Sequence, residues 1–217
     1  MTRVKICGIM TVAQAEACVD LGADSIGVNL VRSSVRCIDV GAARAIVQAV
    51  GARALVVAVV ADLTVDAMVA LRSATGAGCL QLHGDEAARS VEALLPHAYK
   101  AVRVAHRDDV TLAESMPGAY VMVDAKVDGA LGGTGHLVDA ALVAGLAARR
   151  RLVLAGGLTP ENVAQRIATV RPWCVDVASG VERSPGVKDM SRVKAFIDAA
   201  RRADAMPVSP TASHIDR

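Results

Sequence analysis

Short, almost wholly apolar runs alternate along this chain with longer stretches whose apolar residues recur at helical spacing. Runs such as residues 54–60 (ALVVAVV) are typical of strands that are buried on both faces of a parallel sheet. Stretches such as residues 11–21 are rich in alanine, carry apolar residues at helical spacing and predict helices. The alternation therefore predicts strand–helix units that follow one another along the chain.

The pattern predicts about eight such units. We expect strands at residues 4–9, 25–30, 54–60, 79–82, 99–104, 120–124, 152–155 and 174–178. We expect helices at residues 11–21, 41–50, 64–75, 85–94, 108–115, 138–146, 160–168 and 191–202. Side chains that accept hydrogen bonds are favoured just before a helix, so we expect Thr64, Asp85 and Thr159 to act as caps.

This order of elements in 217 residues predicts an α/β fold, a single-domain (β/α)8 TIM barrel, which runs from ~200 residues upward. We expect the catalytic barrel at residues 1–202 and a disordered tail at residues 203–217, which are polar and hold two prolines. The alternative is an open doubly wound sheet, whose dinucleotide-binding form carries G-x-G-x-x-G after its first strand. Gly8 stands alone at that position, which disfavours that form.

Composition narrows the choice of partners. The chain is 53% hydrophobic and only 2% aromatic, so its core must consist mainly of small aliphatic residues. The net charge is +2 and no basic stripe with aromatics is present, so we expect no nucleic-acid partner. No apolar run approaches the ~20 residues that cross a bilayer and no signal-peptide region precedes the first strand, so we expect no membrane partner.

The five cysteines are scattered and form no C-x-x-C pair. This distribution argues against a disulfide framework or a zinc site and favours a reducing cytoplasm. Cys18, Cys79 and Cys174 lie in apolar runs, so we expect them to be small core residues.

In a barrel of this kind the active-site residues lie at the carboxyl ends of the strands. That rule selects a set of polar residues and glycines at the ends of the predicted strands. They are Cys7, Arg36, His83, Asp124, Gly156, Gly157, Asp176, Ser179 and Gly180.

Cys7 and Asp124 are the candidate catalytic pair. A Cys7 thiolate can act as a base if a nearby cation lowers its pKa from ~8.5, and Lys5 points to the same face of the strand. Asp124 ends a buried run, where a carboxyl is unfavourable unless it reaches the barrel mouth or is hydrogen-bonded. A thiol and a carboxyl that face each other can serve as base and acid on one substrate. The alternatives are a structural thiol and a carboxyl that caps a loop.

Glycine-rich tips are candidates for binding phosphate. Residues 156–157 (GG) and 179–180 (SG) follow the seventh and eighth predicted strands, where barrels commonly bind phosphate. Glycines expose backbone N–H groups that can surround the anion, and a further tip at residues 132–135 (GGTG) includes Gly133. The alternative is that these glycines only form tight turns. Two tips at those strands favour a phosphorylated small-molecule substrate.

Arg36 and His83 are candidate substrate contacts. An arginine in the polar loop at residues 31–39 can bind a carboxylate with two parallel hydrogen bonds. The alternative for Arg36 is a solvated surface side chain. His83 is either a polar contact in the barrel mouth or a simple strand-end residue.

Taken together, these motifs resemble phosphoribosylanthranilate isomerase, the tryptophan-pathway enzyme with a (β/α)8 fold. The resemblance covers nearly the whole chain, to about residue 202. The matching stretches are residues 4–9 (VKICGI), 34–36 (SVR), 81–84 (QLHG), 123–126 (VDAK), 132–135 (GGTG), 154–163 (LAGGLTPENV), 175–182 (VDVASGVE) and 185–189 (PGVKD).

The resemblance implies an Amadori rearrangement without metal or cofactor, in which N-(5-phosphoribosyl)anthranilate becomes 1-(2-carboxyphenylamino)-1-deoxyribulose 5-phosphate. It implies that Asp124 is the general acid that protonates the ring oxygen and that Cys7 is the general base that removes the C2 proton. It also places Arg36 at the anthranilate side and Asp176 at the sugar hydroxyls. For such an enzyme we expect a monomer or a homodimer.

The chain departs from the family pattern where a pocket for the aromatic amine is expected. Val28 and Leu30 stand where aromatics are usual, Val35 replaces a proline, and residues 138–140 (VDA) replace Phe-Asp-Trp. Two further hypotheses therefore stay open: an aminoaldose isomerase with a different or broadened amine substrate, and a non-catalytic paralogue that binds a phosphate ester. The similar histidine-pathway isomerase uses an aspartate at the position of Cys7, so the cysteine favours the tryptophan pathway.

Overall fold

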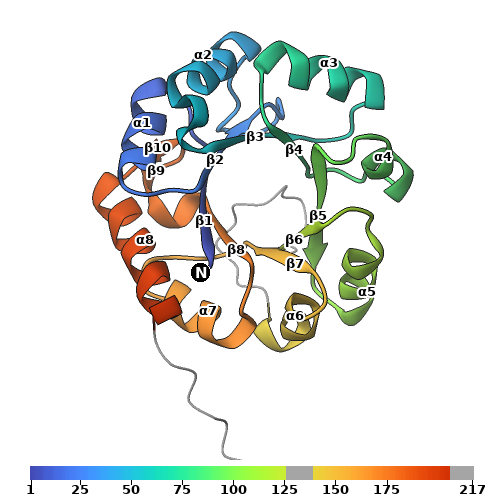
Figure 1. Ribbon diagram of the computed structural model, residues 1–217, viewed down its shortest axis with the longest axis vertical. Coiled ribbons are helices and arrows are strands. Elements are labelled where there is room, and N and C mark those ends of the chain that lie inside the picture. The colour runs from blue at the N-terminus through green and yellow to red at the C-terminus, as the bar shows by residue number, and fades with distance from the viewer. Residues whose placement is uncertain (126–138, 206–217) are drawn as a thin grey trace, which may run out of the picture.

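Eight parallel strands close into a barrel in the computed structural model, which describes residues 1–125 and 139–205. Each strand pairs with the next one in sequence, and β8 pairs with β1 to close the ring (Figure 1). The strands are β1 (Arg3–Cys7), β2 (Ser25–Asn29), β3 (Leu55–Val60), β4 (Cys79–Leu82), β5 (Ala98–Val104), β6 (Tyr120–Ala125), β7 (Arg151–Leu154) and β8 (Cys174–Val177). The predicted (β/α)8 barrel is confirmed.

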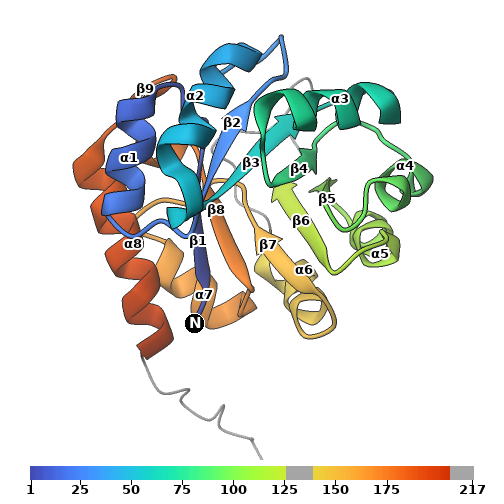
Figure 2. The same ribbon diagram turned by 45° about the horizontal axis from the view of Figure 1, so that its top comes forward.

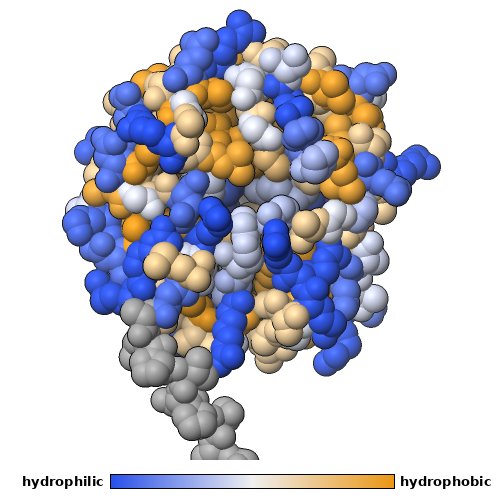
Figure 3. All heavy atoms as spheres, viewed as in Figure 1, coloured by the Kyte–Doolittle hydropathy of each residue, from blue (hydrophilic) through white to orange (hydrophobic). Residues whose placement is uncertain are grey.

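Helices surround the barrel and cover the outer faces of its strands (Figures 1 and 2). They are α1 (Val12–Asp20), α2 (Val40–Val50), α3 (Val65–Thr75), α4 (Ala88–Ala93), α5 (Arg107–Ser115), α6 (Ala140–Ala147), α7 (Val163–Val170) and α8 (Met190–Ala205), with short 3₁₀ helices η1 (Gly51–Arg53) and η2 (Ser179–Val181). Hydrophilic side chains occupy much of the periphery on the face seen in Figure 3. In the part of the chain that the structure describes, no helix has the length and hydropathy needed to span a membrane.

The helix starts depend on which side chain caps them. Thr64 caps α3 as predicted, because its hydroxyl accepts a hydrogen bond from the Ala67 N–H. The predicted cap at Asp85 is wrong, since α4 begins later, at Ala88. The Asp85 carboxylate instead accepts a hydrogen bond from Arg103 Nη2 at 2.6 Å.

The last two helices also differ from their predicted bounds. The predicted cap at Thr159 is wrong, since α7 begins later, at Val163. The Thr159 N–H donates to Asn162 Oδ1 at 2.9 Å in the turn that precedes the helix. α8 continues to Ala205, so the expected start of the tail at residue 203 is wrong. Residues 206–217 lie outside the described residues, and the disorder of the tail stays a prediction.

A two-stranded antiparallel hairpin lies between β8 and α8, where the sequence predicted no strand. It consists of β9 (Glu182–Ser184) and β10 (Val187–Lys188), which are too short to show a period in the sequence. Gly186 turns the chain at φ +80, and a Cβ atom there would lie 2.5 Å from Met10 Sδ. The hairpin therefore packs closely against the segment that follows β1.

The hydrophobic core has two parts. The larger lies between the strands and the helices and includes Cys18. The smaller fills the inside of the barrel and includes Cys174, with the half-buried Cys79 packed against it. The three cysteines therefore pack with the core, as predicted.

Aromatic side chains close the end of the barrel where the strands begin. Tyr120 is the first residue of β6 and Trp173 directly precedes β8, and their ring centroids are 4.6 Å apart. The guanidinium of Arg3 lies 5.3 Å from the Trp173 ring centroid. These aromatics are therefore part of the closed end and lie far from the carboxyl ends of the strands.

Candidate active site

A cavity of about 380 Å³ lies at the carboxyl ends of the strands, a size that suits a small-molecule site. Topology brings residues to it from β1, the loop after β2, the end of β4, β6 and β8. Predicted site residues that line it are Cys7, Arg36, His83, Asp124 and Asp176.

Cys7 is the last residue of β1, and its side chain is only 8% exposed. Gly8 follows at φ +75, a left-handed conformation that lets the chain turn away from the strand. Gly27 pairs with Cys7 on β2, and a Cβ atom there would lie 2.6 Å from Cys7 Sγ and 3.1 Å from Lys5 Nζ. Sequence reasoning missed this role, although a glycine inside an apolar strand signals such a close approach.

The pKa of the Cys7 thiol is raised above its ordinary value, because burial disfavours the thiolate. The Lys5 ammonium lowers this pKa, the Asp176 carboxylate raises it, and the Lys188 ammonium lowers it. Lys5 thus acts in the predicted direction, but burial outweighs it. The resting form of Cys7 at neutral pH is therefore the thiol.

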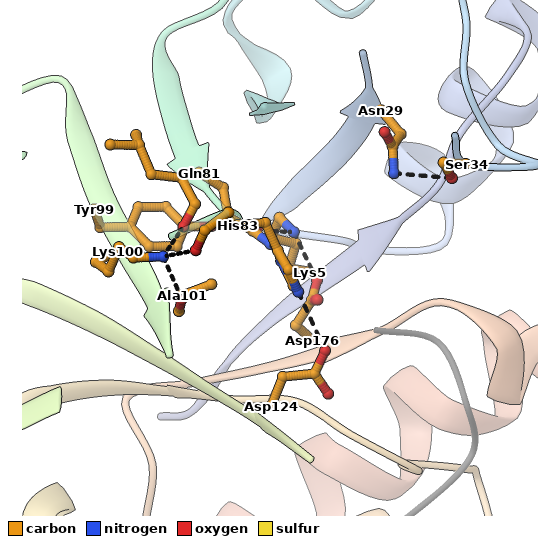
Figure 4. A network of polar contacts seen from close by, with 12 residues as sticks. Lys5, Asn29, Ser34, Gln81, His83, Tyr99, Lys100, Ala101, Asp124 and Asp176 are labelled. Atoms are coloured by element: carbon orange, nitrogen blue, oxygen red, sulfur yellow. Dashed lines mark hydrogen bonds and ion pairs between the residues drawn. The ribbon is translucent and has the colours of Figure 1, made fainter. Parts of the chain in front are cut away.

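A chain of hydrogen bonds crosses the bottom of the cavity, and Figure 4 shows its members converging from several strands. Lys5 Nζ donates to Asp176 Oδ1 at 2.8 Å and to Gln81 Oε1 at 2.9 Å. The Tyr99 hydroxyl donates to the same Gln81 oxygen at 2.8 Å, and Gln81 Nε2 lies 2.8 Å from His83 Nδ1. We call these five buried residues the floor.

Gln81 and Tyr99 were not among the predicted site residues. A signal for Gln81 exists, because a polar residue between the apolar neighbours Leu80 and Leu82 must find buried partners. No local pattern marks Tyr99, which reaches Gln81 only because β4 and β5 are neighbours in the barrel.

Asp124 lies on β6 with 5% of its surface exposed. Its Oδ2 atom is 3.5 Å from His83 Nε2, so the carboxyl stands beside the end of the floor (Figure 4). Cys7 and Asp124 thus enter one cavity from strands on different sides of the barrel.

A second polar cluster lies next to the turn that follows Cys7. Arg36 donates to Glu182 through Nε at 2.8 Å and Nη2 at 2.7 Å, a bidentate pair. Lys188 Nζ donates to Glu182 Oε1 at 2.8 Å. The stem of Arg36 crosses Gly8, where a Cβ atom would lie 2.5 Å from Arg36 Cδ. We call Arg36, Glu182 and Lys188 the rim.

Glu182 and Arg36 keep their charges although both are partly buried. Burial opposes ionisation of Glu182, but hydrogen bonds from Arg36 and Lys188 lower the pKa of its carboxyl below the ordinary value. The hydrogen bond to Glu182 raises the pKa of Arg36, which stays charged. Sequence reasoning gave Glu182 no role, because its partner Arg36 is 146 positions away.

The glycine tips after β7 and β8 pack directly against each other. Gly156 and Gly157 have φ values of +86 and +61, and Asn162 Nδ2 donates to the Gly157 carbonyl at 2.9 Å. A Cβ atom on Gly180 would lie 1.9 Å from the Leu158 carbonyl oxygen, so only glycine fits there. Ser179 and Gly180 begin η2, whose first N–H groups have no partner within the helix. Gly133 lies outside the described residues.

The cavity lining also shows what replaces the expected aromatics. Among the described residues that line it, none is Phe, Tyr or Trp. Asn29 Nδ2 donates to Ser34 Oγ at 3.1 Å, and this hydroxyl accepts from the Arg36 N–H at 3.2 Å. Val35 is 66% exposed. The loop after β2 therefore holds Arg36 through small polar contacts.

Within residues 1–125 and 139–205, no group of three or more His, Cys, Asp or Glu side chains could hold a metal ion. Chemistry without metal or cofactor stays a prediction. The fold and cavity define a TIM-barrel protein in which a thiol and a carboxyl, the candidate acid–base pair, line one cavity at the carboxyl ends of the strands.

Comparisons with known proteins specify the family. The family model described as N-(5'-phosphoribosyl)anthranilate (PRA) isomerase matches residues 4–199. A relative from Pseudomonas aeruginosa named N-(5'-phosphoribosyl)anthranilate isomerase is 41% identical over 201 residues, which cover 92% of this chain and 95% of the relative. The chain belongs to the N-(5'-phosphoribosyl)anthranilate isomerase family, and the resemblance predicted from its motifs is confirmed.

Solved structures agree with that assignment. The crystal structure of phosphoribosyl anthranilate isomerase from Thermotoga maritima has a TM-score of 0.85 at 34% identity, and the match covers 93% of this chain and 100% of that one. A crystal structure of the isomerase in complex with reduced 1-(o-carboxyphenylamino)-1-deoxyribulose 5-phosphate has a TM-score of 0.81 at 32% identity, with the same coverage. The chain is an enzyme of the isomerase class.

Proposed function

We propose that the enzyme converts N-(5'-phosphoribosyl)anthranilate to 1-(2-carboxyphenylamino)-1-deoxyribulose 5-phosphate in tryptophan biosynthesis. The observation that carries this proposal is the presence of Cys7 and Asp124 in one cavity of a chain from this family. A thiol and a carboxyl on different sides of a cavity can move two protons on one bound sugar.

In the proposed mechanism Asp124 gives its proton to the ring oxygen, and the ring opens to an iminium ion. The positive iminium makes the neighbouring C2 proton acidic and favours the Cys7 thiolate beside it. Cys7 removes the C2 proton, and the electron pair of that C–H bond neutralises the iminium nitrogen. The resulting enolamine then tautomerises to the ketone product.

The rim supplies the charge for the anthranilate end of the substrate. One carboxylate, Glu182, faces the two cations Arg36 and Lys188, so the rim carries an excess of positive charge. We expect this charge to attract the anthranilate carboxylate, with Arg36 as the contact. Asp176 and His83, which line the same cavity, are the expected contacts for the sugar.

Backbone N–H groups form the expected phosphate site. The tips at Gly156–Gly157 and Ser179–Gly180 lie side by side, because Gly180 packs against the carbonyl of Leu158. Two tips in contact can direct several N–H groups at one dianion. Gly133, which lies outside the described residues, is a further expected phosphate contact. This arrangement supports a phosphorylated substrate.

Complementation tests the proposal. Expression of the chain in a strain that lacks this isomerase should restore growth without tryptophan, and Asp124→Asn should abolish the rescue while the protein stays folded. Failure of the wild-type chain to restore growth, together with turnover of a phosphoribosylated amine other than anthranilate, would support the alternative of a different amine substrate. The absence of aromatic lining is the observation that favours this alternative. Cytoplasmic location and a monomeric or homodimeric state stay predictions.

A further inference from the structure

The orientation of the Gln81 amide follows from its two buried donors. Gln81 is 1% exposed, and one of its amide atoms faces both Lys5 Nζ at 2.9 Å and the Tyr99 hydroxyl at 2.8 Å. An ammonium group can only donate hydrogen bonds, so the amide atom that it contacts must be the oxygen. The Gln81 NH₂ group therefore points the other way, toward His83.

That orientation determines which nitrogen of His83 carries the proton. Gln81 Nε2 lies 2.8 Å from His83 Nδ1, and an amide NH₂ group is a donor only. Nδ1 must then accept, which requires its lone pair. A neutral imidazole that is unprotonated at Nδ1 carries its proton at Nε2. An imidazolium would place two donors against each other at 2.8 Å.

The His83 Nε2–H group faces the cavity beside Asp124. Nε2 is buried, has no hydrogen-bond partner among the described residues and lies 3.5 Å from Asp124 Oδ2. Because the Nδ1 lone pair is used by Gln81 and Nε2 is protonated, neutral His83 has no lone pair to offer a substrate. It is therefore a donor in this site and not a general base.

We propose that Lys5, Gln81 and Tyr99 are positioning residues that hold His83 as a neutral Nε2–H donor next to the general acid. The effect of this arrangement on catalysis rests on the proposed function, whereas the protonation of His83 does not. When Asp124 gives its proton to the ring oxygen it becomes a carboxylate, and a short move brings Nε2–H into hydrogen-bond distance of it. The interaction is stronger with the carboxylate than with the carboxylic acid, so it favours proton transfer.

Nitrogen NMR of the ¹⁵N-histidine-labelled enzyme tests the tautomer directly. The His83 resonances, assigned by their loss in His83→Asn, should show a protonated Nε2 and an unprotonated Nδ1 at neutral pH. A protonated Nδ1 in the wild-type enzyme overturns the proposal. This measurement needs no substrate, so its outcome is independent of whether the proposed isomerase activity is confirmed.

Gln81→Glu tests the positioning role with almost no change of shape. A carboxylate can accept from Lys5, Tyr99 and His83 together, so the His83 proton should move to Nδ1 or the ring should become charged. We expect kcat to fall about ten- to a hundredfold, the worth of a hydrogen bond to a charged group. An altered protonation of His83 with an unchanged kcat contradicts the catalytic consequence, and an unaltered protonation contradicts the positioning.

Tyr99→Phe is the matched control, because it removes one of the two donors and leaves the Lys5 ammonium on the Gln81 oxygen. The Nε2–H form should persist in this variant, and its kcat should fall less than that of Gln81→Glu. Loss of the Nε2–H form in a folded Tyr99→Phe protein would show that Lys5 does not orient the amide.

Discussion

Two buried lysine–carboxylate pairs, one in the floor and one in the rim, have the same length and opposite electrostatic outcomes. Lys5 and Asp176 are 2.8 Å apart inside the barrel, and Lys188 and Glu182 are 2.8 Å apart in the hairpin. Burial lowers the pKa of Lys5, but Asp176, Cys7 and Tyr99 together raise it to well above the ordinary value. Burial also lowers the pKa of Lys188, and there the carboxylate does not compensate.

The two lysines differ in their neighbours beyond the paired carboxylate, and Tyr99 also raises the pKa of Lys5. Asp176 pairs with Lys5, whereas Glu182 serves Lys188 and Arg36 together, and the Arg36 charge lowers the pKa of Lys188. The Lys5–Asp176 pair of the floor is thus internally neutral and fixes orientations, while the rim keeps surplus positive charge for an anion. We therefore expect changes near the floor to act on kcat and changes at the rim to act on KM.

Cys7→Ser should have the largest effect. A hydroxyl is far too weak a base at neutral pH, so kcat should fall by about 10²–10⁴-fold, the usual contribution of a general base. Steady-state kinetics measures this fall in kcat. Cys79→Ser, which changes a half-buried cysteine on β4, is the matched control and should keep its activity. A Cys7→Ser enzyme with most of its activity would mean that Cys7 is a structural thiol.

Gly157→Val should raise KM, as changes at the rim should, although the glycine carries no charge. Gly157 has φ +61, and a β-branched side chain there both strains the turn and blocks approach of a phosphate to the backbone. We expect KM to rise about ten- to a hundredfold, as for the loss of a hydrogen bond to a charged group. Inorganic phosphate should compete with substrate in the wild type and less in the variant. An unchanged KM would exclude these N–H groups as the phosphate site.

The pH dependence of activity should show that burial is the main influence on the pKa of the Cys7 thiol. Its raised pKa means that the thiolate fraction is small at neutral pH and grows as pH rises. On the limb set by the thiol, kcat/KM should therefore rise by up to about tenfold per pH unit and continue past ~8.5, the pKa of a free thiol. If the rise of kcat/KM with pH instead levels off below pH 7, the Lys5 ammonium affects the pKa of Cys7 more strongly in solution than burial does.

Glu182→Gln should have the smallest effect and should separate the rim from the floor. The neutral amide cannot hold Arg36 by two charge-assisted bonds, so the guanidinium loses its fixed position. We expect KM to rise about five- to tenfold with kcat almost unchanged, as loss of substrate positioning by charge predicts. Glu161→Gln, which breaks an exposed pair with Arg192, is the control and should change neither constant. A fall in kcat without a rise in KM would remove the distinction between the two clusters.

The sequence by itself determined the barrel and the placement of the candidate residues. Alternation of apolar runs and helical stretches is a local property, and in a parallel barrel it is enough to send every strand end to one face. Cys7, His83 and Asp124 could be identified because each ends such a run. Helix starts were less predictable, since Asp85 and Thr159 had competing partners nearby.

Only the tertiary structure decided the chemistry of those residues. The Gln81 amide is oriented by Lys5 and Tyr99, which lie 76 and 18 positions away and meet it inside the barrel. The Arg36–Glu182 pair likewise joins segments from opposite ends of the chain. The Cys7 pKa depends on how completely folding removes water around the thiol, and Gly27 makes room for it only because β2 lies beside β1. Hydrogen-bond direction and desolvation depend on distances between strands, which no local pattern encodes.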